Sequence, residues 1–190
     1  MGNACKFQPT GLTDEQMRMV QRVQQGFHCS EVLLFAGLEA QGKINPDVIR
    51  TVSVLAGGVG FSGELCGALT GGACLLGLFD GRGDENETAD PRLNIMVNEL
   101  IDWFAAKYGA DYGGIRCREI TEDDPKNQPL RCPRIVGGVL KKVKSLLAEN
   151  GFEWEQASSL GEPGSRAVQL PGIAGDSHPQ AACPCAARTR

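Results

Sequence analysis

The sequence predicts an all-α protein, a compact bundle of about six helices followed by a disordered C-terminal tail. Apolar residues recur at helical spacing in most segments. Helix-capping and helix-ending residues divide the chain, and little of it alternates as a strand does. With 190 residues, of which 42% are hydrophobic, the chain is long enough to bury one sizeable core.

The composition along the chain predicts three parts: a flexible leader over 1–12, a helical domain over 13–154 that carries four notable cysteines, and a disordered tail over 155–190. The tail is rich in Gly, Pro, Ala and Ser and has little apolar periodicity, so it is not expected to bury a core. One domain with a tail is the predicted organisation.

Four helices are predicted in the first half of the chain, three from a capping pattern and the second from its apolar residues. Thr13, with Gln16 three residues later, forms a capping box. Asn45 before Pro46 places an N-cap residue in front of a first-turn proline. Ser62 is the expected cap of the fourth helix. The predicted ranges are 13–25, 28–40, 45–58 and 62–79.

The second half contains two further predicted helices. The polar loop GRGDENETAD ends at an Asp-Pro pair, which begins an amphipathic helix over 90–107. The segment 108–129 is predicted to be mostly irregular and contains Cys117. Cys132 and Pro133 are predicted to open the last helix, which ends at the Asn-Gly pair that follows.

Three glycines recur every four residues in the predicted fourth helix: Gly63, Gly67 and Gly71. Small residues at this spacing form a bare ridge that lets another backbone approach closely. Two interpretations are open. The ridge either packs tightly against a neighbouring helix or makes room for a bulky group beside Cys66.

Charge and hydropathy narrow the possible functions. A formal net charge of -4 gives no reason to expect nucleic acid. The stretch 51–79 is long enough to span a bilayer, but its eight glycines and Glu64 favour a buried helix pair instead. The N-terminus lacks the basic and then apolar pattern of a secretory signal. A cytoplasmic protein with no membrane span is therefore expected.

In a reducing compartment, the eight cysteines point to metal binding or redox chemistry rather than to a disulfide scaffold. There is no C-x-x-C motif, so neither a zinc ribbon nor a thioredoxin active site is indicated. The compact cysteine runs of bacterial ferredoxins are also absent. Four isolated cysteines remain the candidate site residues: Cys29, Cys66, Cys117 and Cys132.

Cys132 has the clearest physical case among them. As the predicted N-cap before Pro133, it would lie where free backbone N–H groups and the positive helix end favour the thiolate. Arginines flank both Cys132 and Cys117, and two interpretations are open. They either form one electropositive pocket or make ordinary surface ion pairs with nearby acidic residues. The basic residues concerned are Arg116, Arg118, Arg131 and Arg134.

The remaining cysteines differ in how strongly the sequence supports a functional role. Cys29 follows His28, whose imidazole can donate a hydrogen bond, accept a proton or bind a metal, although a lone histidine more often has no such role. Cys74 would lie about 12 Å from Cys66 along one helix and is predicted to be a small buried apolar residue. No role is predicted for three cysteines in the leader and tail: Cys5, Cys183 and Cys185.

The chain resembles the family of redox-active proteins named for the cysteine pattern C–GCAxxG–C–C. The similarity covers roughly 13–151, and order, spacing and neighbouring residues all agree. One departure is CGALTG, where the family name writes GCAxxG. The matching segments are GFHCSEVLL around Cys29, GGVGFSGELCGALTGG around Cys66, YGGIRCREIT around Cys117 and RCPRIVGGVLKKV around Cys132.

The resemblance implies a helical domain and a redox role for the four matching cysteines. It also implies a setting among anaerobic or metal-reducing microbes. A related domain occurs in split-Soret cytochromes, where it is thought to hold an iron–sulfur cluster. Haem is not implied for this chain, because it has no C-x-x-C-H motif.

Three functional hypotheses follow. The leading one is electron transfer to a redox protein partner through an iron–sulfur cluster held by the four cysteines. The second is a thiol–disulfide oxidoreductase without metal, in which Cys132 attacks and another of the four resolves the bond. The third is a structural module that binds zinc through the same residues. A homodimer is left open.

Overall fold

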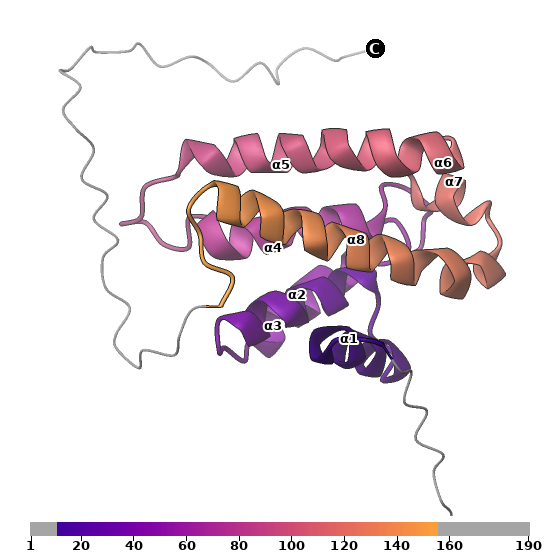
Figure 1. Ribbon diagram of the computed structural model, residues 1–190, viewed down its shortest axis with the longest axis horizontal. Helices are drawn as coiled ribbons and strands as arrows, with labels where there is room; N and C mark the ends of the chain where they lie inside the picture. The colour runs from indigo at the N-terminus through magenta and orange to yellow at the C-terminus, as the bar shows by residue number, and fades with distance from the viewer. Residues whose placement is uncertain (1–10, 156–190) are drawn as a thin grey trace, which may run out of the picture. The chain divides into compact units, whose positions relative to one another are not determined.

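The structure is a computed structural model in which residues 11–155 are described, and these contain helices but no strand (Figure 1). The all-α prediction is confirmed. The predicted leader and tail fall almost entirely outside the described residues. The helices of seven or more residues are α1 (Asp14–Gln24), α2 (Cys29–Ala40), α3 (Pro46–Val52), α4 (Gly67–Asp80), α5 (Pro91–Phe104) and α8 (Gln128–Glu149).

Five shorter helical segments connect these helices. One of them, a π-helix over 105–109, directly follows α5, so the polypeptide stays helical beyond the predicted end at 107. The segment 108–129, predicted to be mostly irregular, contains three of the five. The segments are η1 (Ser53–Leu55, 3-10), η2 (Ala105–Gly109, π), α6 (Ala110–Tyr112), α7 (Cys117–Thr121) and η3 (Pro125–Asn127, 3-10).

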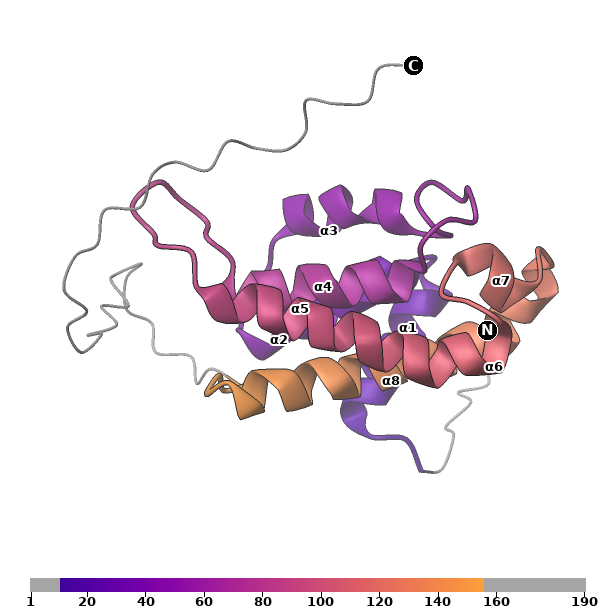
Figure 2. The same cartoon turned by 90° about the horizontal axis from the view of Figure 1, so that it is seen from above.

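Helix α4 is central, because it packs against α2, α5 and α8 (Figures 1 and 2). Its Leu75 and Leu76 are fully buried. Gly72 permits the close approach of α5 and α8, since a Cβ atom there would lie 2.6 Å from Val139 and 3.1 Å from Leu100. No helix of the described part is long and apolar enough to cross a membrane.

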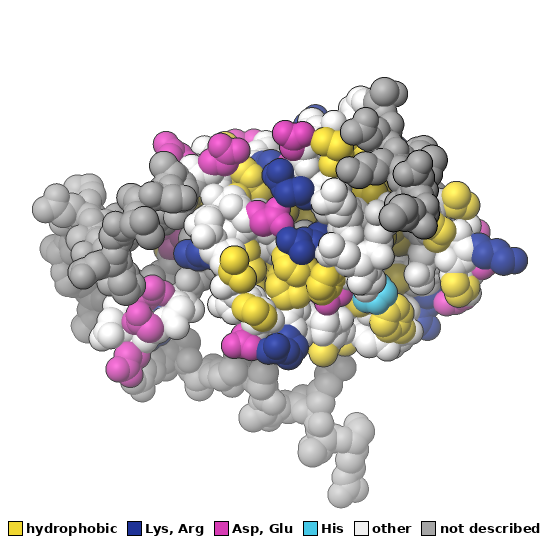
Figure 3. All heavy atoms as spheres, turned by 90° about the horizontal axis from the view of Figure 1, so that it is seen from below, with side chains coloured by type: hydrophobic (Ala, Val, Ile, Leu, Met, Phe, Trp, Pro, Cys, Tyr) yellow, Lys and Arg dark blue, Asp and Glu magenta, His cyan; other side chains and the backbone are white. Residues whose placement is uncertain are grey.

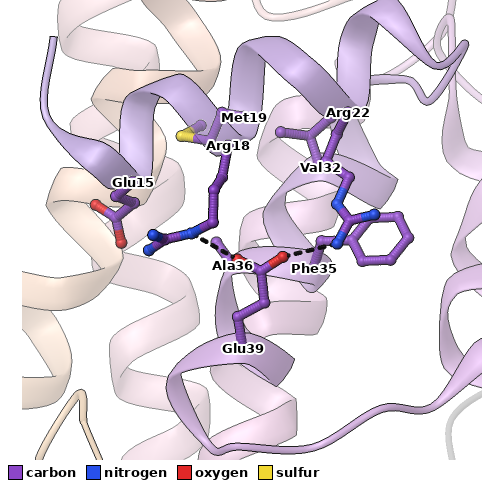
Figure 4. A pocket seen from close by; sticks show the side chains of 8 residues that line it. All are labelled: Glu15, Arg18, Met19, Arg22, Val32, Phe35, Ala36 and Glu39. Atoms are coloured by element: carbon purple, nitrogen blue, oxygen red, sulfur yellow. Dashed lines mark hydrogen bonds and ion pairs between the residues drawn. The ribbon is translucent and has the colours of Figure 1, made fainter.

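Helix α1 is attached to α2 by a charged contact, shown in Figure 4. Glu39 of α2 accepts hydrogen bonds from Arg18 at 3.0 Å and from Arg22 at 2.9 Å. The predicted capping box is present: the Thr13 N–H donates to the Gln16 side chain, and the Gln16 N–H donates back to Thr13. The first helix therefore begins where its sequence predicts.

Two predicted helix starts are wrong. Helix α4 begins at Gly67 rather than at Ser62, because the backbone has positive φ angles at several positions between 57 and 63. Helix α8 begins at Gln128, four residues before Cys132. Pro129 is the first-turn proline of α8, and Pro133 lies inside the helix.

Two adjacent glycines of α8 allow a matched test of this packing. We expect Gly137→Ala to raise the free energy of unfolding by about 0.5–1 kcal/mol, because alanine favours the helix and a Cβ atom there meets nothing within 4 Å. We expect Gly138→Ala to lower it by about 1–2 kcal/mol, because its Cβ would lie 2.1 Å from the hydroxyl of buried Tyr108. Urea unfolding of both variants measures the difference, and equal effects would contradict the packing described.

A candidate four-cysteine redox site

Three of the four candidate cysteines lie at helix N-termini. Cys29 is the first residue of α2, Cys66 is the N-cap of α4, and Cys117 is the first residue of α7. Cys132 is the fifth residue of α8, so its prediction as an N-cap is wrong. The helix-end environment expected for Cys132 thus belongs to the other three cysteines.

A short backbone pairing places Cys66 beside Cys117. Leu65 and Arg116 form an isolated antiparallel bridge. The Cys66 N–H donates to the Ile115 carbonyl at 3.1 Å, and the Cys117 N–H donates to the Glu64 carbonyl at 2.7 Å. This contact joins segments about fifty residues apart in the sequence, and Figure 2 shows α7 beside the loop that precedes α4.

The glycines of α4 place Cys29 against the same region. A Cβ atom at Gly67 would lie 2.7 Å from the Cys29 sulfur, and one at Gly71 would lie 2.7 Å from the Cα atom of Ser30. The Ser30 hydroxyl donates to the Val52 carbonyl at 2.9 Å and fixes this end of α2. The interpretation of the glycines as a tight packing ridge is therefore correct for Gly67 and Gly71, whereas Gly63 lies outside the helix.

The loop 57–63 lies against the candidate site, a role that was not predicted. Val59 and Phe61 have φ angles of 62° and 60°, an unfavourable conformation for side chains of this kind. At Gly58 a Cβ atom would lie 2.4 Å from the Glu64 carbonyl oxygen and 2.8 Å from the Cβ atom of Cys117. The density of glycines in GGVGFSG was the available sign that the backbone approaches another group closely.

The arginines form ion pairs and brace the backbone. Arg118 pairs with Glu64 at 2.5 Å and donates to the carbonyls of Ser62 at 2.9 Å and Gly63 at 3.2 Å. Arg116 lies 3.7 Å from the same carboxylate. Arg131, in α8, pairs with an acidic neighbour and donates to a carbonyl of α7. These contacts match the ion-pair interpretation rather than an electropositive pocket around the sulfurs.

Burial disfavours the thiolate at all four positions. It raises the pKa of Cys66 to about 12 and that of Cys132 to about 11. Burial also raises the pKa of Cys29, although the backbone groups of Gly57 and Ser30 lower it in part. The pKa of Cys117 is raised by burial and then by Asp123. The depressed pKa expected at Cys132 is therefore not found, because the residue lies within α8 rather than at its N-terminus and its thiol is partly desolvated.

Electrostatic interactions link Cys29 and Cys117 to each other and to both Cys66 and Cys132. After burial, Cys29 and Cys117 are the next causes that raise the pKa of Cys132. The same two cysteines raise the pKa of Cys66. Cys74 is exposed and the pKa of its thiol is raised by desolvation alone, so it lies apart from the site rather than in the core as predicted. The leader and tail cysteines are outside the described residues.

His28 is the N-cap of α2, next to Cys29. Its ring packs edge-on against Phe61, with 5.1 Å between the ring centroids. Its backbone N–H donates to the carboxylate of Glu31 at 2.8 Å. Both contacts assign His28 a packing and capping role.

The four thiols do not form a site for one metal ion as they stand. Among residues 11–155, no three His, Cys, Asp or Glu side chains are grouped closely enough to hold a single ion. All the cysteines of this range are free thiols. The candidate site thus consists of one buried and three half-buried thiols beside a glycine-rich backbone.

The raised pKa values predict how the stability of the metal-free, reduced protein depends on pH. A thiol whose pKa is higher when folded stabilises the fold below its unfolded pKa of about 9, and this contribution is lost as the pH rises toward the folded value. We therefore expect the free energy of unfolding to fall between about pH 9 and 11. Urea unfolding under reducing conditions measures it. Cys66→Ala should flatten the fall, and an unchanged slope would contradict the burial of this thiol.

Comparison with known proteins gives one match. The family model "Putative redox-active protein (C_GCAxxG_C_C)" matches residues 27–146, a range that includes all four candidate cysteines. No curated protein and no solved structure matches the chain. Because the matched range covers more than half of the sequence, the chain belongs to the C_GCAxxG_C_C family of redox-active proteins.

Proposed function

We propose that this redox-active protein transfers electrons through an iron–sulfur cluster held by Cys29, Cys66, Cys117 and Cys132. The observation that supports the proposal is that Cys29 and Cys117 interact electrostatically with each other and with both Cys66 and Cys132, although the four thiols come from four separate segments. Four cysteine thiolates are the usual ligand set of such clusters, which supply a one-electron couple when bound.

The surrounding backbone suits a negatively charged group. Helices α2 and α4 begin at cysteines of the site, so their unpaired N–H groups and positive ends lie beside the sulfurs. The N–H groups of Ala68 and Leu69 favour the thiolate of Cys66, although burial outweighs them in setting its pKa. Such groups stabilise sulfur ligands and adjust a reduction potential.

The raised pKa values also support metal ligation. Burial and mutual repulsion disfavour four thiolates unless a cation offsets their charge, and bound metal deprotonates a coordinating thiol. A single zinc ion would bring its four sulfurs to about 3.8 Å from one another, given Zn–S bonds of about 2.3 Å. A cluster of several iron atoms holds its thiolates farther apart, which suits thiols that meet without grouping around one point.

Thiol–disulfide exchange is the weaker candidate. With a pKa of about 11, the Cys132 thiol would be ionised in only about one molecule in ten thousand at pH 7. A thiol of this kind attacks a disulfide slowly. The free thiols among the described residues are nevertheless consistent with the reducing cytoplasm that we propose as the compartment.

The test is a visible absorption spectrum of anaerobically purified protein, with analysis of iron, acid-labile sulfide and zinc. We expect broad visible absorption and matching amounts of iron and sulfide. A colourless protein that contains zinc would replace the proposal with a structural site. A colourless, metal-free protein that cannot be reconstituted with iron and sulfide would leave the dithiol hypothesis.

A further inference from the structure

A groove between α2 and α3 lies apart from the sulfurs but shares the first turn of α2 with them. Its volume is about 510 Å³, which is in the range of small-molecule sites. Figure 3 shows hydrophobic side chains gathered in the middle of the face over α1 and α3, bordered by basic and acidic side chains. Apolar residues form much of the groove, including Phe27, Phe35, Leu38 and Ile49.

The aromatic part of the groove suits a planar ring. Phe27 and Phe35 pack edge to face, with 4.7 Å between their centroids. The guanidinium of Arg22 covers the Phe35 ring at 4.2 Å and is engaged by Glu39. A flat apolar ligand would therefore contact Phe27 and the edges of the Phe35 ring, beside the ring face that Arg22 covers, and would leave the ion pair intact.

Two polar side chains of the groove limit which polar groups a ligand could carry. Glu31 lines it and is only 7% exposed, although its carboxylate receives a hydrogen bond from the His28 backbone. Lys43 lines it too, on the loop after α2, and forms no ion pair within the described residues. Glu31 can accept a hydrogen bond in apolar surroundings, and Lys43 can donate one to an oxygen.

Helix α2 connects this groove to the proposed redox site. Cys29 and Glu31 are two residues apart, about 3 Å along the axis, and lie on opposite sides of the same turn. A ligand in the groove would thus be separated from the Cys29 sulfur by the width of one helix.

We infer that the groove binds a hydroquinone and its quinone, a two-electron aromatic carrier that exchanges electrons with the four-cysteine site. This inference rests on the proposed function. A fatty acid fits less well, because its carboxylate would share the groove with Glu31. An organic cation fits less well because the rim carries Lys43 and Arg50. A hydroquinone offers a ring to the phenylalanines, a hydroxyl to Glu31 and a second oxygen to Lys43.

The exchange balances as follows. Oxidation of one hydroquinone to the quinone breaks two O–H bonds and releases two protons and two electrons. Water accepts both protons. Two oxidised four-cysteine sites each take up one electron, as the proposed one-electron couple requires.

The test is anaerobic calorimetric titration of the full chain with menadiol and menadione, performed on metal-free and on iron-loaded protein. We expect both compounds to bind both forms. Glu31→Gln, which keeps the shape and the hydrogen bond to His28, should weaken menadiol binding about tenfold and menadione binding much less, because only the hydroquinone donates to the carboxylate. Lys43→Met should weaken binding of both. Glu99→Gln and Lys141→Met, on exposed positions outside the groove, are the matched controls and should change neither.

The inference would be overturned if neither compound bound the metal-free protein, if Glu31→Gln bound menadiol as tightly as the unchanged protein, or if decanoate displaced menadiol. It would also be overturned if menadiol bound the iron-loaded protein without bleaching its visible absorption, although dithionite does bleach it. Decanoate displacement would assign the groove to amphipathic anions instead. Absence of iron and sulfide would refute the proposed function by itself, and the titration of metal-free protein would still decide whether the groove binds the carrier.

Discussion

Gly58→Ala is expected to lower the free energy of unfolding by about 2–5 kcal/mol. An alanine at φ +77° adopts the left-handed conformation, which costs about 1–2 kcal/mol. Its Cβ atom would also lie 2.5 Å from the Glu64 nitrogen and 2.8 Å from the Cβ atom of Cys117. Overpacking of this kind costs about 1–3 kcal/mol. Because backbone atoms cannot rotate away, the two costs add.

Gly60→Ala separates these two costs. Gly60 has φ +61° in the same loop, but a Cβ atom there meets nothing within 4 Å. Its alanine variant should therefore lose only the conformational part, about 1–2 kcal/mol. The midpoint and slope of urea unfolding give both values. Equal losses for the two variants would show that the loop does not press against Cys117 as described.

The helix starts that were predicted correctly depend on local contacts. Asn45 accepts hydrogen bonds from the N–H groups of Asp47 and Val48, and Asp90 accepts one from Arg92. These partners lie within three residues of the cap, so a short stretch of sequence contains the whole interaction. For this reason the starts of α1, α3 and α5 could be predicted from the residues alone.

The helix starts that were predicted wrongly depend on contacts between distant segments. Ser62 does not cap α4, because its hydroxyl donates to the Gly58 carbonyl inside the loop. Cys66 begins the helix instead, and its N–H is paired with the Ile115 carbonyl. At α8, the choice between Pro129 and Pro133 as the first-turn proline could not be made from sequence spacing.

The four candidate cysteines could be chosen from the sequence, but their surroundings could not. The range that the family model matches includes all four cysteines, and Cys29 and Cys117 interact electrostatically with each other and with Cys66 and Cys132. Their burial depends on packing across the bundle, which the sequence alone does not give. The arginines beside Cys117 therefore suggested a positive pocket, whereas the structure pairs Arg116 and Arg118 with Glu64.

Single cysteine-to-serine changes are expected to have the largest effect on the proposed cluster. A serine hydroxyl is a harder ligand than a thiolate and ionises far less readily, so it is a poor substitute at iron. Loss of a residue that only orients a ligand already costs about 10–100-fold in metal affinity. We therefore expect at least a tenfold loss of iron and sulfide for each of Cys29→Ser, Cys66→Ser, Cys117→Ser and Cys132→Ser.

Cys74→Ser is the matched control, because this cysteine is exposed and lies apart from the site on the same helix that Cys66 caps. It should retain the iron and sulfide content of the unchanged protein. Helicity by circular dichroism and the urea midpoint separate loss of the cluster from loss of the fold, which matters most for buried Cys66. If one of the four variants kept its full iron content while folded, that cysteine would not be a ligand. If all four kept it, electron transfer through a cluster at this site would be wrong.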